Sequence, residues 1–225
     1  QAVLPQLSRA ENDDEFIDTL RQAIRFALFV VLPASLGAIE LSSQFVHLIF
    51  VRGEFNSWAW GATTSCLALS MLGLPGMACS TVVMRALYAL SMPHEAFKVT
   101  GFSVLSTAVL SLLLVYPMGY NGLALAPGIA FTLSGFLGMY YVRKKLNKPL
   151  KIITKKILGD YFIALTILDV TIVIYKFLWP YNTGARIYVR ASWCFIIIIL
   201  SAITYSIFTF KMKFDEWNLL KQAFR

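Results

Sequence analysis

The chain has 225 residues, of which 58% are hydrophobic and 14% are charged, and its mean hydropathy is +0.67. Soluble domains carry about 25% charged residues, so this composition excludes an ordinary soluble protein and predicts an all-α membrane protein. The net charge of +8 also suits a nucleic-acid-binding surface, but the densest cations lie between apolar stretches long enough to cross a bilayer, which argues against that class.

Six apolar segments are each long enough to cross a hydrocarbon core of about 30 Å. In chain order they cover residues 23–45, 58–80 with a helical extension to 91, 99–117, 122–142, 160–179 and 190–210. Before the first segment, Ser8 with Glu11 and Asn12 with Glu15 have the spacing of a helix capping box. We therefore predict that residues 1–22 hold the end of a preceding helix and a cytoplasmic interfacial helix that leads into the first span.

The segments differ in how they are expected to pack. The second is interrupted at Gly73, Pro75 and Gly76, where a missing backbone donor kinks or breaks a helix, so these three residues are hinge candidates. The fourth has a small residue at every fourth position, which lets another helix approach closely: Ala126, Ala130, Ser134 and Gly138. The last two segments lack Gly within 161–179 and 191–210, which predicts a lipid-facing or lipid-binding periphery.

A basic run separates the fourth and fifth segments. Residues 143–156 contain seven cations and no acid, and we interpret them as a basic cytoplasmic linker. With six spans both chain ends share one side, and 16 of the 20 Lys and Arg residues fall on the side that holds the ends and the basic run. The positive-inside rule therefore places both ends in the cytoplasm.

Charged side chains at membrane depth cost about 2.5 to 3.5 kcal/mol on insertion scales, so each is a candidate functional residue. Asp169, near the middle of the fifth segment, either meets a neighbouring helix or water, or acts on substrate or protons. Arg85 either extends to the cytoplasmic surface or contacts substrate. Arg52 follows the first segment in a turn, where it either pairs with Glu54 or faces the substrate. Arg52, Arg85 and Asp169 are thus the predicted substrate-path residues.

The sequence contains no recognisable catalytic or metal-binding arrangement. Its two histidines, His47 and His94, have no Cys at ligand spacing, and its three cysteines lie far apart without a CxxC pair. There is no Ser/His/Asp order, no paired carboxylates in an outer loop and no Gly-rich phosphate loop. We therefore predict that the protein is not an enzyme, has no metal site and uses no cofactor, with the coupling ion or membrane potential left open.

Several short motifs, in this order, resemble the MurJ/MviN lipid II flippases of the multidrug/oligosaccharidyl-lipid/polysaccharide exporter superfamily. Residues 3–9 read V-L-P-Q-L-S-R, like the family's L-P-x-L-S-R segment, and Leu32 and Pro33 follow inside the first span. Residues 50–55 resemble the family's F-x-R-G-x-F turn. Residues 85–90, before Pro93, resemble its Y-A-L…P helix end, and residues 121–126 resemble its N-G-x-A-L-A helix start. The resemblance covers nearly the whole chain.

The family has fourteen membrane helices, in two six-helix lobes followed by two further helices, with both ends cytoplasmic. The resemblance implies that this chain corresponds to the tail of the eighth helix and to helices nine to fourteen. It implies a four-helix part of the C-terminal transport lobe at residues 23–142, the basic linker at 143–156, a peripheral two-helix pair at 157–211 and a cytoplasmic tail at 212–225.

For function, the resemblance implies export of an undecaprenyl-pyrophosphate-linked peptidoglycan precursor, lipid II, across the bacterial inner membrane by alternating access, in cell-wall synthesis and the maintenance of cell shape. The implied partners are this lipid, membrane lipids and a missing N-terminal lobe, with no nucleic acid. The last two helices would hold the polyprenyl tail. The family's cationic cavity is built mainly from helices that this chain lacks, so no head-group residue is carried over.

Two alternatives accompany this interpretation. In the first, the chain is part of an exporter of another polyprenyl-linked glycan or of a drug. In the second, it is a non-transporting membrane scaffold. Twelve-helix exporters would end near Lys148, so the additional apolar pair favours the flippase. The chain also departs from the family at residues 91–95, which read S-M-P-H-E in place of the usual D-T-R-T-P.

Overall fold

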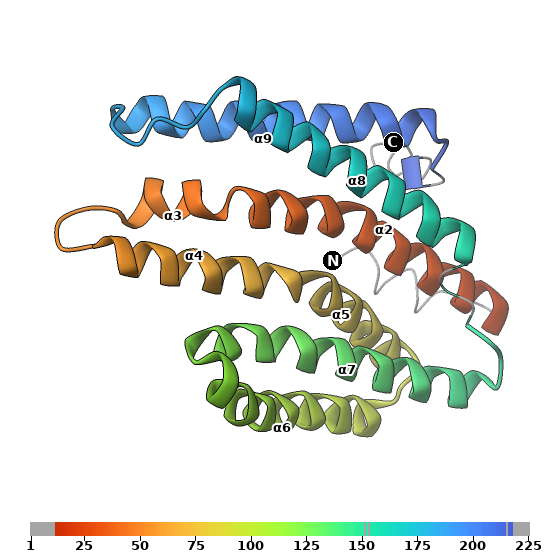
Figure 1. The fold of residues 1–225 in the computed structure, drawn as a ribbon. Coiled ribbons are helices and arrows are strands. Elements are labelled where there is room, and N and C mark those ends of the chain that lie inside the picture. Colours follow the sequence, from red (N-terminus) through yellow and green to blue (C-terminus); the bar gives the residue numbers. More distant parts are fainter. Residues whose placement is uncertain (1–11, 151, 153, 215, 218–225) are drawn as a thin grey trace. The chain divides into compact units, whose positions relative to one another are not determined.

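The computed structural model describes residues 12–150, 152, 154–214, 216 and 217. Every named element in this part is an α-helix, as Figure 1 shows. The helices are α2 (Asp13–Glu40), α3 (Ser42–Phe50), α4 (Ser57–Leu72), α5 (Leu74–Ala89), α6 (Pro93–Met118), α7 (Tyr120–Leu146), α8 (Lys155–Leu178) and α9 (Ile187–Lys211). Six candidate membrane spans result, with α4 and α5 forming one span together, which confirms the predicted membrane fold class.

The first span differs from the prediction. α2 begins at Asp13 and continues without interruption to Glu40, so within the described part no separate interfacial helix precedes the span. Three acidic residues in its first turn stabilise this early start through the helix dipole: Asp13, Asp14 and Glu15. Beyond Leu41 the chain continues as the short helix α3. Residues 1–11, where the end of a preceding helix was predicted, lie outside the described residues, as does most of the predicted tail.

The described residues divide into two compact units. One comprises the chain up to Val31 together with Gly73–Lys155, and the other comprises Leu32–Leu72 together with the chain from Lys156 onward. The chain thus passes between units within α2, at the junction of α4 and α5, and at the start of α8. We refer to them as the first and the second unit.

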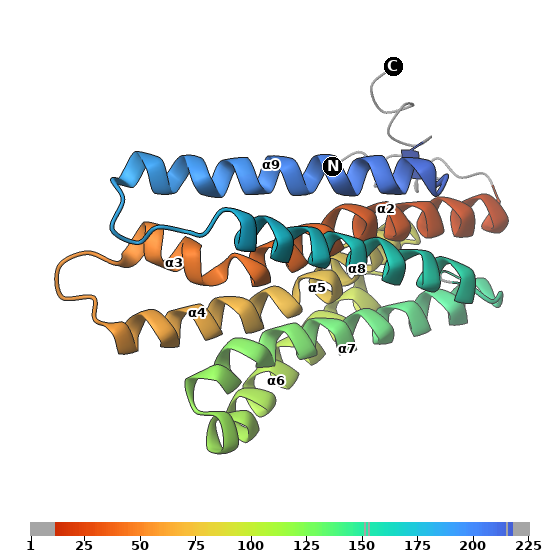
Figure 2. The same ribbon diagram turned by 45° about the horizontal axis from the view of Figure 1, so that its top comes forward.

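Small residues bring the helices of the first unit together. α5, α6 and α7 lie side by side in both ribbon views (Figures 1 and 2). All four residues of the predicted small-residue stripe of α7 are buried, and Ala126 and Ala130 have no exposed surface. The hydroxyl oxygens of Ser134 and of Ser80 in α5 lie 3.1 Å apart. The stripe therefore serves as the predicted contact face.

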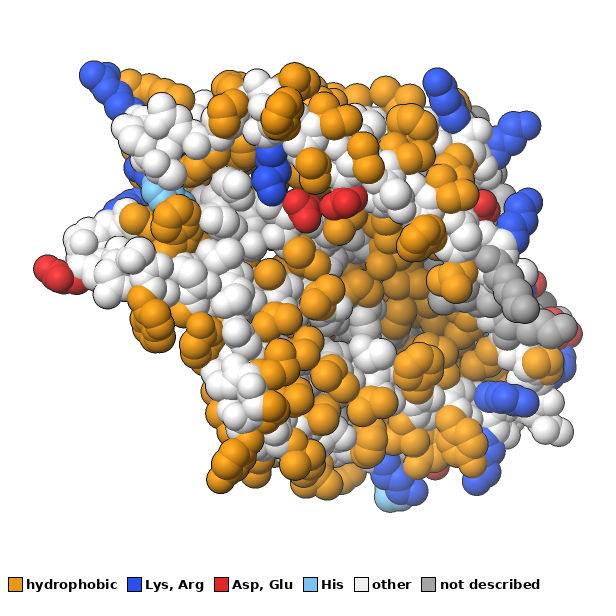
Figure 3. Space-filling model, viewed as in Figure 1, with side chains coloured by type: hydrophobic (Ala, Val, Ile, Leu, Met, Phe, Trp, Pro, Cys, Tyr) orange, Lys and Arg blue, Asp and Glu red, His pale blue; other side chains and the backbone are white. Residues whose placement is uncertain are grey.

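Large side chains fill the second unit and also cover its outer surface. Ile172 of α8 and Ile197 of α9 are fully buried, whereas Phe177 is 85% and Phe195 64% exposed. In the space-filling view, hydrophobic side chains are spread over much of the visible face (Figure 3). Such exposed apolar surface is expected of helices that face lipid.

Candidate functional site: a helix break and a basic strap

The break between α4 and α5 lies where it was predicted. α4 ends at Leu72, Gly73 precedes α5, and Pro75 occupies the first turn of α5. Proline has no N–H, so the carbonyl of Met71, four residues earlier, lacks the partner that a continuous helix would supply. The buried Ser35 hydroxyl of α2 donates a hydrogen bond to that carbonyl instead. A side chain of α2 thus satisfies the backbone acceptor that the break leaves open.

The two glycines of the break allow close contact with α7. A Cβ atom on Gly128 would lie 2.5 Å from the Cα atom of Gly73, which is closer than real side chains come. A Cβ atom on Gly76 would collide with the Thr132 side chain, whose hydroxyl donates to the Gly128 carbonyl at 2.8 Å. Gly76 and Gly128 are therefore required by the close packing of α5 against α7, and Gly73 supplies the backbone that meets Gly128.

An apolar cavity of about 360 Å³ lies beside the break, within the first unit. Its wall comes from α2, α5, α7 and the linker after α7, and includes Leu28, Pro75, Gly76, Phe136 and Ile152. Pro75 and Gly76 therefore line open space, and Gly73 and Gly76 lie against α7.

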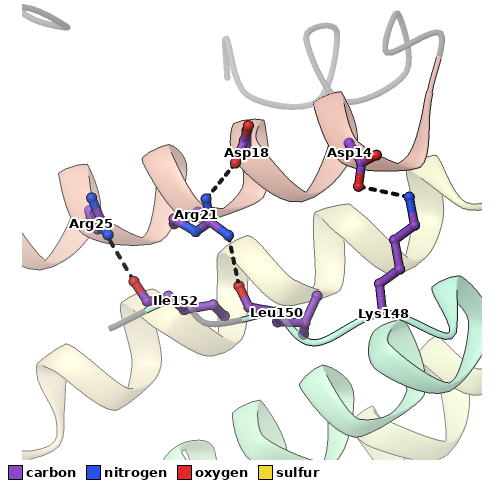
Figure 4. Close-up of polar contacts among 7 residues, drawn as sticks. All are labelled: Asp14, Asp18, Arg21, Arg25, Lys148, Leu150 and Ile152. Carbon is purple, nitrogen blue, oxygen red and sulfur yellow. Dashed lines mark hydrogen bonds and ion pairs between the residues drawn. The ribbon is translucent and has the colours of Figure 1, made fainter. Parts of the chain in front are cut away.

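A stretch of the basic run lies along α2, and we call its residues 148–150 and 152 the strap (Figure 4). Arg21 donates from Nη2 to the carbonyl oxygen of Leu150 at 3.4 Å, and Arg25 donates from Nε to that of Ile152 at 3.2 Å. The side chains of Leu150 and Ile152 are buried. The strap has no helix of its own, so these arginines satisfy two of its backbone acceptors.

Two ion pairs accompany the strap. Lys148 lies 2.7 Å from Asp14, and Arg21 also pairs with Asp18 (Figure 4). The hydrogen bond to Asp14, together with the charges of Asp14 and Asp13, raises the pKa of Lys148. The pair with Asp14 is exposed, so its contribution to stability is small. The basic run is thus partly held against the acidic start of α2.

The three predicted substrate-path residues are divided between the two units: Arg85 belongs to the first, and Arg52 and Asp169 belong to the second. Arg52 is exposed in a turn that Gly53 forms with a φ of +55°, and no ion pair joins it to Glu54 in the described part. Arg85 and Asp169 are half-buried in α5 and α8, respectively. None of the three lines the cavity beside the helix break. Their role on a substrate path stays a prediction.

Sequence reasoning missed an ion pair at the end of α2. Lys176 of α8 lies 3.2 Å from the carboxylate of Glu40 and donates to the Glu40 backbone carbonyl at 2.9 Å. Both side chains are about 70% buried. One feature of the sequence indicates the pair: Glu40 is the single acid within the apolar segment 23–45, and an acid at that depth needs a cationic partner.

A family model described as the lipid II flippase MurJ matches residues 1–192. A protein of Rickettsia prowazekii named probable lipid II flippase MurJ is 28% identical over 131 residues, which is 57% of this chain and 26% of that protein. Its Vibrio cholerae counterpart of the same name is 31% identical over 149 residues, covering 64% of this chain and 27% of the relative. The aligned part spans about a quarter of these relatives' length.

A solved structure of a lipid II flippase MurJ in an inward closed conformation matches 93% of this chain and 42% of its own chain. The TM-score is 0.66 and the sequence identity is 23%, a likeness that shows a shared fold. This fold agrees with the six candidate spans, and the family model extends well beyond half of the sequence. The chain therefore belongs to the lipid II flippase MurJ family.

Proposed function

We propose that this chain is the C-terminal part of a lipid II flippase, which exports the lipid-linked peptidoglycan precursor by alternating access. The observation that carries the proposal is the family match over residues 1–192. The aligned part spans only about a quarter of the relatives' length, so the activity requires the remaining helices, including an N-terminal lobe. The family is one of transporters, so no catalytic step is assigned to any residue.

We further propose that the protein lies in the bacterial inner membrane with both ends of this chain in the cytoplasm. The 16 of 20 cations on one side support this orientation. The basic run, residues 143–156, lies on the same side by this assignment, where anionic lipid head groups attract its cations. The exposed aromatic and aliphatic side chains of α8 and α9 fit a peripheral pair that holds a polyprenyl tail.

The helix break is the proposed hinge of the transport cycle. Two helical connections join the two units, and each carries a proline near the point of passage: Pro33 in α2 and Pro75 at the start of α5. Proline removes one intrahelical hydrogen bond and so lowers the cost of bending there. The third connection is at the start of α8, directly after the stretch 147–154, whose described residues are not helical. All three connections are thus suited to bending.

Depletion of the gene that encodes this chain tests the function. Cells are labelled from outside with a membrane-impermeant reagent that modifies lipid II, and the modified fraction is measured. We expect this fraction to fall severalfold on depletion and to return on complementation. A depleted cell that keeps its normal outer-leaflet lipid II contradicts the flippase function, and would leave the scaffold or another export substrate as the explanation.

A further inference from the structure

A second cavity, of about 300 Å³, lies entirely within the second unit. Its wall includes the aromatic rings of Trp60, Tyr181 and Trp193 and the polar side chains of Ser43, Gln44, Lys176 and Thr183. The indole nitrogen of Trp60 donates to the Ser43 carbonyl at 3.0 Å, and that of Trp193 donates to the Trp179 carbonyl at 2.8 Å. Two sides of the cavity are therefore held by fixed rings.

The cavity lies where several membrane-spanning helices begin or end. Lys176 is in the last turn of α8, Trp193 is in the second turn of α9, and Trp60 is in the first turn of α4. Trp and Tyr side chains concentrate at membrane–water interfaces because their rings are amphipathic. The cavity is thus placed at the level of lipid head groups, at the end of these spans away from the basic run.

The polar groups around the cavity carry an excess of positive charge. Lys176 gives two of its three N–H donors to Glu40, which leaves one for a ligand. Arg190 donates from Nη1 to Nδ1 of His47 at 3.0 Å, and His47 also lies 3.2 Å from the hydroxyl of Tyr181 in the wall. Arginine can only donate hydrogen bonds, so Nδ1 of His47 accepts this one and carries no proton. The His47 ring is therefore neutral. Among the described residues, Arg190 has no carboxylate partner.

Two further polar atoms have no hydrogen-bond partner in the described structure, although both are shielded from solvent. They are Oε1 of Gln44 and Nε of Arg190. Leaving such a group unpaired costs about 1 to 3 kcal/mol, so a ligand that pairs with it gains affinity. Gln44 lines the cavity, and a half-turn of its amide presents either the oxygen or the nitrogen. A suitable ligand therefore offers both an anion and a hydroxyl donor.

We propose that this cavity binds the head group of an anionic phospholipid, a phosphate that carries a glycerol. The phosphate accepts from Lys176 and from the Ser43 hydroxyl, and a glycerol hydroxyl donates to Oε1 of Gln44. Phosphate suits these donors because hydrogen bonds between charged groups are shorter and stronger than neutral ones. The cavity volume is at the lower end for ligand sites, which fits a head group better than a whole lipid.

Native mass spectrometry of the full chain in detergent tests the site, with phosphatidylglycerol or phosphatidylcholine added at equal concentration. We expect one phosphatidylglycerol to be retained about tenfold more tightly than phosphatidylcholine. Equal retention of the two lipids overturns the proposal. Soluble glycerol 3-phosphate is added as a competitor, and we expect weak displacement because it lacks the acyl chains. Displacement at the affinity of the lipid would show that the site takes a free phosphate ester instead.

Variants of the cavity wall test whether the lipid binds in this cavity. Gln44→Leu keeps the volume and removes an oxygen that has no protein partner, so the fold is retained while phosphatidylglycerol retention falls about threefold to tenfold. Lys176→Gln lowers retention about tenfold or more. If its loss of the Glu40 partner prevents folding, the double variant Glu40→Gln with Lys176→Gln removes both charges, and the same loss of binding is expected.

Arg186→Gln is the matched control. Arg186 is exposed, immediately precedes α9 and does not line the cavity, so the variant removes one charge from the same end of the unit. We expect its phosphatidylglycerol retention to equal that of the parent. Equal losses in Arg186→Gln and Lys176→Gln would show general attraction to a basic surface. Full retention in both Gln44→Leu and Lys176→Gln would place the lipid elsewhere.

Discussion

Each of the two compact units is held together internally by a different kind of contact. In the first, α5 and α7 come so close that the backbone of Gly73 leaves no room for a side chain at Gly128. In the second, large side chains fill the space between helices, and polar pairs such as Lys176 with Glu40 join them. Close backbone contact fixes the register of two helices, whereas long side chains adapt by changing rotamer. We therefore expect bending at the connections between units and little sliding of α5 on α7.

The largest effect is expected for Gly128→Ala. The new methyl group would lie 2.5 Å from the Cα atom of Gly73, and a backbone atom cannot move aside as a flexible side chain does. We expect the apparent free energy of unfolding in mixed micelles to fall by about 3 kcal/mol or more, at or beyond the upper end for overpacked sites.

Gly135→Ala is the control on the same helix. Its Cβ atom would lie 3.5 Å from the nearest atoms, those of Ser80, which is ordinary van der Waals contact. We expect a change of less than about 1 kcal/mol, because alanine also has the higher helix propensity. Equal losses for the two variants would mean that α5 and α7 are not in the close contact on which the comparison of the units rests.

An intermediate effect is expected at the helix break. Ser35→Ala removes the hydroxyl that donates to the Met71 carbonyl, and a buried acceptor without a partner costs about 1 to 3 kcal/mol. Pro75→Ala restores an N–H that bonds to the same carbonyl in a continuous helix. The loss caused by Ser35→Ala, measured in mixed micelles, should therefore be smaller when residue 75 is alanine.

A double-mutant cycle measures this coupling directly. If Ser35→Ala costs the same with proline or alanine at residue 75, the hydroxyl does not compensate for the break. Outer-leaflet lipid II labelling of the Pro75→Ala strain tests the proposed hinge separately. We expect labelling to decrease while the protein remains in the membrane, because a continuous helix bends less easily.

A smaller effect is expected when the strap is released. Replacing Arg21 and Arg25 with alanine removes two hydrogen bonds to strap carbonyls, each worth about 0.5 to 1.5 kcal/mol. Hydrogen exchange of residues 146–150 should become faster by about tenfold, with exchange in α9 unchanged. Lys148→Ala removes an exposed ion pair and should change this exchange less. No difference between the double variant and the parent would show that the arginines do not hold the strap.

The sequence alone predicted the features that depend on local composition. The break at Gly73 and Pro75 and the buried stripe of α7 follow from missing backbone donors and from a four-residue period. The pair of Lys176 with Glu40 was not predicted, because its members are 136 residues apart and pairing depends on tertiary structure. The strap was missed for another reason: its acceptors are backbone carbonyls, which every residue has.

The smallest effect on stability is expected when acidic pH protonates His47. This side chain lies in α3, beyond the end of the first span, and burial together with the nearby Arg190 charge lowers its pKa below 6.5. The unfolded chain therefore binds a proton at a higher pH than the folded chain does.

The stability that neutral His47 contributes is thus complete above about pH 6.5 and is lost as the pH falls toward the lower pKa of the folded state. Unfolding in mixed micelles, measured from pH 7.5 down to pH 5, should show this loss in the parent and less of it in His47→Gln. The variant His94→Gln changes an exposed histidine of α6 and should keep the parent's pH dependence. Because His47 accepts from Arg190 in the second unit, a parent whose stability is flat over this range would mean that this polar contact does not hold α3 to α9.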